Sequence, residues 1–184
     1  MLISKFITED MQDSVVSFEK NHGIQLPSDY RLFIYKYNGG ETIKTNWPGK
    51  EKSDVRGFYG INLKDSNWDL VTNLKYEIPE RLLEEGYLIF ANNSFGDYFC
   101  IKLDDESIWF VYHDKSSRTQ IANELTEFIG KCKSEPIGHI RTIEERKEML
   151  IANGKGHKID EKKVALWQKE IDRYANIHQE IIEL

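Results

Sequence analysis

The sequence predicts a single α+β domain with a mainly antiparallel central sheet flanked by helices, followed by a C-terminal helical extension. Three observations support this fold class: a well-delimited amphipathic helix after Pro27, three apolar strands between residues 87 and 112, and two helical patterns beyond Pro136. The chain has 184 residues, 40% of them hydrophobic, which is enough for one well-buried core. We therefore expect a domain over residues 1–136 and a two-helix extension over residues 137–184.

The first predicted helix covers residues 8–22. Thr8 can cap it, acidic residues occupy its first turns, where the helix dipole favours negative charge, and Gly23 can close it. His22 stands in the last turn, where a histidine also interacts favourably with the dipole. We interpret His22 in this way and not as a ligand or a catalytic group.

The strongest local signal is a second helix that begins at Pro27. Proline suits a first helical turn, because its missing N–H would have no partner there. Asn38-Gly39-Gly40 is expected to end the helix, since Asn and Gly tolerate the left-handed conformation that closes helices. A single apolar stripe at helical spacing is formed by Tyr30, Phe33, Ile34 and Tyr37.

A short strand over residues 41–45 and a polar, turn-rich loop over residues 46–53 are expected next. Trp47 lies in this loop and has two interpretations. It folds back onto the core, or it is displayed as an anchor for a partner, a role in which tryptophan is common.

Residues 55–62 alternate as a strand, although glycines loosen the pattern. Ser66 can cap a following helix, and Ile78-Pro79 is expected to stop it. Asp65 and Asp69 flank the start of this helix. They are either surface acids that the helix dipole favours or part of an acidic face for a partner.

Three successive strands predict an antiparallel meander. Two turns join them, and they cover residues 87–91, 97–103 and 108–112. The second turn carries Asp104, Asp105 and Glu106, which we interpret as a solvated hairpin tip in preference to a cation site. A further helix is expected over residues 121–132, because its apolar residues recur at helical spacing.

Beyond Pro136, Thr142 and Glu145 form a capping box that opens one helix. Asp160 can cap a last helix that is expected to run to the C-terminus. Its apolar seam consists of Val164, Trp167, Ile171, Tyr174, His178 and Ile181. Such a seam needs a partner, so we expect it to fold back on the domain, with a weak homodimer as the alternative to a monomer.

The acidic charge is concentrated in the first domain. The chain has 31 acidic and 25 basic residues, and residues 1–136 hold 22 acidic and 16 basic ones, which is the whole net charge of −6. This balance disfavours a nucleic-acid partner, because such proteins usually present a basic face to phosphates. A basic protein partner suits it better.

Other classes of site are not indicated. Cys100 and Cys132 lack the spacing of a metal site or a disulfide framework, and we expect both in the core. The histidines show no metal-binding spacing, so neither a metal nor a cofactor is predicted. The N-terminus does not resemble a signal peptide, and no segment reaches the ~20 apolar residues of a membrane span, so we expect a cytoplasmic protein without membrane contact.

The ordered set from Leu26 to Gly40, Leu-Pro-x-x-Tyr-x-x-Phe followed by Asn-Gly-Gly, resembles the signature of the SUKH superfamily, the Smi/Knr-type domains. The resemblance extends to the meander and its following helix, and covers about residues 8 to 133. Its further matching elements are Ile78-Pro79, Gly96-Asp97, the segment 100–103, Val111-Tyr112-His113-Asp114 and Phe128.

The resemblance implies a bacterial immunity protein that binds a cognate toxin, often a nuclease, and is not an enzyme. A non-catalytic regulatory or scaffolding module of the Smi/Knr type, related to the cell wall or to signalling, is the alternative, and an unrecognised enzyme is the third class. His113-Asp114 does not indicate catalysis, because neighbouring side chains on an extended chain point to opposite sides. The predicted partner-binding residues are the anchors Trp47, Tyr59 and Trp68 and the acids Glu41, Asp65, Asp69, Asp104, Asp105 and Glu106.

Overall fold

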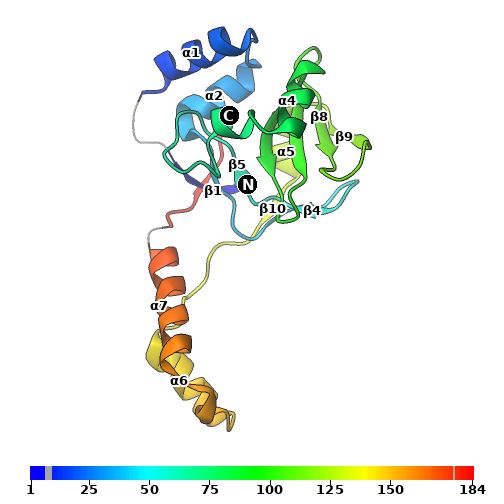
Figure 1. Cartoon of the computed structure of the whole chain (residues 1–184). Helices are drawn as coiled ribbons and strands as arrows, with labels where there is room; N and C mark the ends of the chain where they lie inside the picture. Colours follow the sequence, from blue (N-terminus) through cyan, green and yellow to red (C-terminus); the bar gives the residue numbers. More distant parts are fainter. Residues whose placement is uncertain (7–9, 176) are drawn as a thin grey trace. The chain divides into compact units, whose positions relative to one another are not determined.

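The computed structural model describes residues 1–6, 10–175 and 177–184, and it confirms the α+β class (Figure 1). The chain divides into two compact units. The sheet unit comprises Met1–Pro136 together with Gln179–Leu184, and the helical hairpin comprises Ile137–His178. The final residues of the predicted extension are thus part of the sheet unit.

Among the described residues, the sheet unit is built on an eight-stranded sheet in the order β11-β1-β2-β5-β6-β7-β8-β9, with every neighbouring pair antiparallel. Its strands are β1 (Leu2–Lys5), β2 (Gly40–Glu41), β5 (Gly57–Phe58), β6 (Tyr87–Asn92), β7 (Tyr98–Lys102), β8 (Ile108–Val111), β9 (Arg118–Ala122) and β11 (Glu180–Ile181). The predicted meander is confirmed in β6, β7 and β8, and β9 extends it.

A smaller sheet in the described part of the chain has the order β10-β3-β4. Its strands are β3 (Thr45–Trp47), β4 (Ser53–Asp54) and β10 (Lys133–Ser134). The prediction of one strand over residues 41–45 followed by a loop was therefore wrong in its bounds. Trp47 pairs with Ser53 across β3 and β4, so part of the predicted loop is a short hairpin.

Two helices follow β1: α1 (Gln12–His22) and α2 (Ser28–Tyr37). Thr8, the predicted cap of α1, lies outside the described residues. The apolar stripe of α2 is confirmed, because all four of its side chains are buried. Asn38 ends α2 at a φ of 45°, and its backbone N–H donates to the carbonyl of Ile34 at 3.0 Å.

The side chain of Asn38 also fixes the chain end of α2 to a distant segment. Its Nδ2 donates to the carbonyl oxygen of Ile61 at 3.0 Å, and its Oδ1 accepts from the backbone N–H of Ile61 at 2.7 Å. Gly60 passes so close that an added Cβ would lie 2.1 Å from the Asn38 carbonyl oxygen. This close approach is possible only because residue 60 has no side chain.

The predicted helix from Ser66 to Ile78 is replaced by two shorter helices, α3 (Leu70–Asn73) and α4 (Glu77–Glu84). Asp69, and not Ser66, caps α3. Pro79 lies within the first turn of α4, so the expectation that it stops a helix was wrong. The first four backbone N–H groups of a helix have no intrahelical partner, and proline is therefore tolerated there.

Helix α5 (Leu125–Lys131) begins later than predicted, because Ile121 and Ala122 belong to β9. Phe128 of α5 is fully buried, and its ring centroid lies 5.3 Å from that of Trp47 and 5.2 Å from that of Phe99. These rings join the helix, the small sheet and the large sheet in one aromatic core. Cys100 and Cys132 are buried, as predicted.

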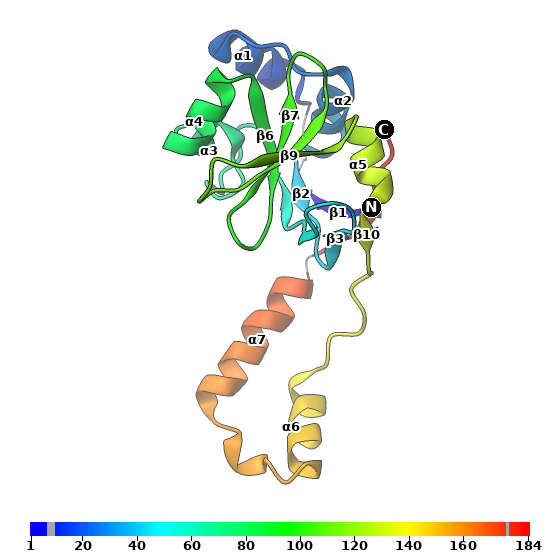
Figure 2. The same cartoon turned by 90° about the vertical axis from the view of Figure 1, so that its right-hand side faces the viewer.

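The helical hairpin contains α6 (Ile143–Ala152), the 3₁₀ turn η1 (Gly156–Lys158) and α7 (Glu161–Ala175), with α6 and α7 side by side (Figure 2). The capping box of Thr142 and Glu145 is confirmed, and Asp160 Oδ1 accepts from the N–H of Lys163 at 2.7 Å. An ion pair of 2.9 Å joins Arg146 to Glu170. None of the described hairpin residues is buried.

The prediction that the last helix reaches the C-terminus was wrong. Helix α7 ends at Ala175, and the chain then forms β11, in which Ile181 pairs with Leu2 of β1. Ile182 is buried in the sheet unit, and the N–H of Glu183 donates to the hydroxyl of Tyr37 at 2.9 Å. Strand β11 thus pairs with the edge of β1 that β2 leaves free. Within the described chain, no helix combines the length and apolar character needed to cross a membrane.

Candidate partner-binding site

Three of the nine predicted partner-binding residues line one hollow of the sheet unit. Glu41 comes from β2, and Asp65 and Trp68 come from the segment between β5 and α3. The hollow has a volume of about 250 Å³, and Phe6, Leu63 and the single cation Lys64 also line it. We call it the acidic hollow.

The acidic hollow combines an aromatic wall with carboxylates. The rings of Phe6 and Trp68 lie 5.6 Å apart between centroids, and the guanidinium of Arg56 lies 5.0 Å from the centre of the Trp68 ring. The chain's own arginine shows that this ring accepts a cation. Carboxylates beside an aromatic wall are suited to a lysine or arginine side chain, which gains an ion pair there.

The structure corrects the predicted role of the aromatic anchors. Trp47 and Tyr59 are each only 2% exposed, and Trp68 is 4% exposed. The indole of Trp47 donates to the carbonyl of Lys50 at 2.7 Å, and the hydroxyl of Tyr59 accepts from Asn92 Nδ2 at 3.0 Å. Their burial follows from packing in the core, so Trp47 and Tyr59 offer no surface to a partner and Trp68 contributes only the wall of the hollow.

Asp69 also has an internal role. It is 5% exposed, and its carboxylate accepts hydrogen bonds from the backbone N–H groups of Leu63 and Thr72 at 3.0 and 2.8 Å. The hydroxyl of Thr72 adds a third bond at 2.7 Å. Asp69 therefore holds the start of α3 and does not belong to an acidic face.

The three acids between β7 and β8 have different surroundings. Asp105 Oδ1 accepts from the N–H and the hydroxyl of Ser107, at 3.0 and 2.5 Å, and these bonds hold the pKa of its carboxyl below the usual range. Asp104 lies 2.9 Å from Lys102 Nζ, with its side chain 69% exposed. Glu106 is exposed as well and adopts a φ of 62°. Asp105 shapes the turn, and Asp104 and Glu106 present charge.

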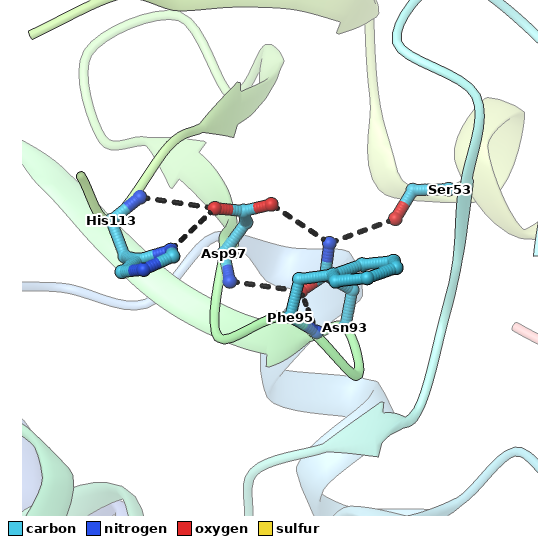
Figure 3. Close-up of polar contacts among 5 residues, drawn as sticks. All are labelled: Ser53, Asn93, Phe95, Asp97 and His113. Carbon is cyan, nitrogen blue, oxygen red and sulfur yellow. Dashed lines mark hydrogen bonds and ion pairs between the residues drawn. The ribbon is translucent and has the colours of Figure 1, made fainter. Parts of the chain in front are cut away.

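A polar network that the sequence did not predict surrounds Asp97, in the turn between β6 and β7 (Figure 3). The carboxylate Oδ1 accepts from the backbone N–H of His113 at 3.1 Å and lies 2.8 Å from its ring Nδ1. Asn93 Nδ2 donates to Asp97 Oδ2 at 3.0 Å and to Ser53 Oγ at 2.9 Å. An ionised carboxylate only accepts hydrogen bonds, so Nδ1 of His113 carries the proton.

Burial by itself would raise the pKa of Asp97, but the hydrogen bonds from His113 and Asn93 outweigh it and hold the pKa below its usual value. His113 contacts Asp97 and does not pair with the adjacent Asp114 as a simple dyad would. Ligand atoms of Asp97, His113 and Asp114 lie within 4.8 Å of one another, which makes them a group among the described residues that could hold a metal ion. The hydrogen bonds to Asp97 already account for its position.

Comparison with known proteins places these elements in a family. The model of the SMI1 / KNR4 family (SUKH-1) matches residues 12–131, which is more than half of the chain. The chain belongs to this family. The resemblance indicated by the signature from Leu26 to Gly40 is therefore confirmed. The matched SUKH-1 segment runs from α1 through α5.

A relative of the chain is the SPbeta prophage-derived uncharacterized protein YokK of Bacillus subtilis (strain 168). It is 28% identical over 150 residues, which cover 68% of this chain and 76% of that protein. Helices α6 and α7 lie beyond the SUKH-1 match. The acidic hollow, in contrast, is lined by Glu41, Asp65 and Trp68 from within the match.

Proposed function

We propose that this protein is an immunity protein, which binds a cognate bacterial toxin and neutralises it by protein–protein contact. The observation that carries the proposal is the SUKH-1 match over residues 12–131, because similar bacterial proteins act in this way. The prophage origin of the Bacillus subtilis relative supports it, since an immunity gene on a mobile element would travel with its toxin gene. The chain would act in the cytoplasm, without a cofactor and without catalysis.

The charge of the sheet unit supports a basic partner, such as a nuclease. Residues 1–136 carry the whole net charge of −6. A nuclease presents basic groups to phosphates, and an acidic surface complements that pattern and accelerates association. In the proposed complex, the acidic hollow receives a lysine or arginine side chain of the toxin between Glu41 and Asp65, and Asp104 and Glu106 contribute longer-range attraction.

Co-expression tests the function. The chain is produced together with the product of the neighbouring upstream gene, and cell survival and co-purification are scored at low and moderate salt. Rescue with a stable, salt-sensitive complex is the expected result. If neither rescue nor a complex is found with neighbouring gene products, the proposal is wrong, and a wider pull-down then tests the regulatory module of the Smi/Knr type.

Substitutions in the acidic hollow test the interface. Asp65→Asn and Glu41→Gln each remove one charge from the hollow, and Glu84→Gln removes one charge from the exposed surface of α4 as the matched control. The hollow variants should weaken binding of the toxin about tenfold, and the control should leave it within about twofold. Equal effects of all three substitutions would show that net charge, and not the hollow, determines binding.

A further inference from the structure

Three cations gather around a second hollow of the otherwise acidic sheet unit. The hollow lies between α4 and the segment that joins β8 to β9, and its volume is about 230 Å³. Arg81 comes from α4, Lys115 from the joining segment and Arg118 from the start of β9. We call this hollow the cation pocket.

Two of these cations are held in place by neighbouring rings. Lys115 Nζ lies 4.3 Å from the centre of the Tyr112 ring, and the guanidinium of Arg118 lies 4.8 Å from the centre of the Tyr87 ring. Arg118 is further fixed by an ion pair of 2.5 Å with Glu85. Side chains that are ordered before a ligand arrives lose less conformational entropy when it binds.

The charges of the cation pocket do not cancel. Glu85 is the acidic residue among those that line the hollow, and its carboxylate is already paired with Arg118. Outside the lining, Glu51 binds the hydroxyl of Tyr112 at 2.5 Å. Arg81 makes no ion pair with any described residue and is exposed. The lining therefore retains an excess of positive charge.

One wall of the cation pocket is apolar. It consists of Ile78 and Leu82 of α4 and Val111 of β8, of which Leu82 and Val111 are buried. An apolar wall next to cations lowers the local dielectric, so the attraction for an anion is stronger there than on an open surface. Ile78, which is only partly buried, can contact the apolar body of a ligand.

We propose that the cation pocket binds a phosphate group of a small molecule. Two guanidinium groups present planar forks of N–H donors, which match phosphate oxygens, and the ammonium of Lys115 adds a third positive charge. The phosphate lies between Arg81 and Arg118, and an organic group attached to it contacts Ile78. This site is separate in its residues from the acidic hollow and does not depend on the proposed toxin partner.

Titrations monitored by amide NMR test the proposal with three probes: inorganic phosphate, phenyl phosphate and acetate. We expect shifts at the lining residues with both phosphates, tighter binding of phenyl phosphate because of the apolar wall, and weaker binding of acetate. Arg81→Gln and Lys115→Gln should each weaken phosphate binding about tenfold. Lys64→Gln removes a cation that lines the acidic hollow and should change nothing.

Several results would overturn the assignment. Shifts that spread over the surface without a maximum at the lining residues exclude a site. Equal weakening by Lys64→Gln and Arg81→Gln shows a general effect of charge, and acetate binding as tight as phosphate binding excludes a phosphate site. Loss of thermal stability in Arg81→Gln is checked first by circular dichroism, and Lys115→Gln, on an exposed segment, provides the second variant.

Discussion

Asp97 accepts a hydrogen bond from the backbone N–H of His113 at 3.1 Å, and the same carboxylate oxygen lies 2.8 Å from the His113 ring. The two residues connect the turn between β6 and β7 with the end of β8. Asp97 is 6% exposed, so the bonds operate largely out of water. The pair therefore stabilises one end of the meander.

Asp97→Asn should lower the free energy of unfolding at neutral pH by about 1–3 kcal/mol. The substitution replaces a charged acceptor of the hydrogen bonds from His113 and Asn93 with a neutral amide. The pKa of Asp97 in the folded protein lies below its usual value of 3.8. Its contribution is consequently present above about pH 4 and is lost as the pH falls through the folded value. Urea unfolding at several pH values should show a shallower acid dependence in the variant. Asp114→Asn is the exposed control, and identical acid slopes for wild type and Asp97→Asn would contradict this role.

Tyr30→Phe should leave the free energy of unfolding unchanged or raise it by about 1 kcal/mol, although Tyr30 belongs to α2, which carries the family signature. The Tyr30 hydroxyl is fully buried and has no hydrogen-bond partner among the described residues. Its removal eliminates a desolvated polar group and leaves the ring packing intact. The midpoint of urea unfolding measures the effect. A loss of more than about 1 kcal/mol would mean that the hydroxyl has a partner, such as a buried water molecule.

Gly60→Ala and Gly130→Ala should have opposite effects. A Cβ at residue 60 would meet the Asn38 carbonyl oxygen, so we expect a loss of about 3 kcal/mol or failure to fold. Gly130 lies in α5, and a Cβ there meets nothing within 4 Å. Gly130→Ala should stabilise the protein by about 0.5–1 kcal/mol through helix propensity. Thermal unfolding compares them, and similar destabilisation by both would contradict the described backbone packing.

Asp105→Ala should cost about 1–2 kcal/mol of stability, because it removes both hydrogen bonds from Ser107. Asp104→Ala loses only an exposed ion pair with Lys102 and should cost less than about 0.5 kcal/mol. With a basic toxin, Asp104→Ala should slow association and reduce its salt dependence. Stopped-flow mixing and chemical unfolding separate the two effects, and a large stability loss in Asp104→Ala would refute this division.

The helical hairpin should associate weakly with a second copy. The predicted seam on α7 is half-buried. Trp167 of the seam lines a hollow together with Met149 of α6, so α6 covers part of the seam's apolar surface. Ile151 and Leu166 remain 63% and 65% exposed. Sedimentation equilibrium should show mass rising with concentration, and the double variant Ile151→Ser, Leu166→Ser should abolish the rise. Phe95→Ser, at an exposed ring of the sheet unit, is the control, and a concentration-independent monomer would exclude the dimer.

Local patterns predicted the elements whose signals are self-contained. The ends of α2 follow from Pro27 and Asn38, and the capping box of α6 follows from Thr142 and Glu145, because each signal acts within a few residues. The strands β6 to β8 and the placement of both cysteines in the core were also predictable. A buried position such as Phe128 follows from helical spacing alone.

Interactions between distant residues were not predictable in the same way. The local sequence around Trp47 predicts a loop, and it gives no sign of the packing against Phe128, which is on a helix far along the chain. Strand β11 carries a helical pattern in the sequence, and pairing with β1 overrides it. The acidic charge of the candidate site was predictable from composition. That Glu41 and Asp65 line one hollow, and that Asp97 contacts His113, depends on how the sheet folds.

The pairing of β11 with β1 makes the helical hairpin an insertion instead of a tail. Leu2 donates from its backbone N–H to Ser134 Oγ at 3.0 Å and pairs with Ile181, so the chain leaves and re-enters the sheet unit beside one residue. Insertions at such points leave the host's core and strand register unchanged. Over evolution, the hairpin can be lengthened, exchanged or lost as a cassette, while the same host domain is retained.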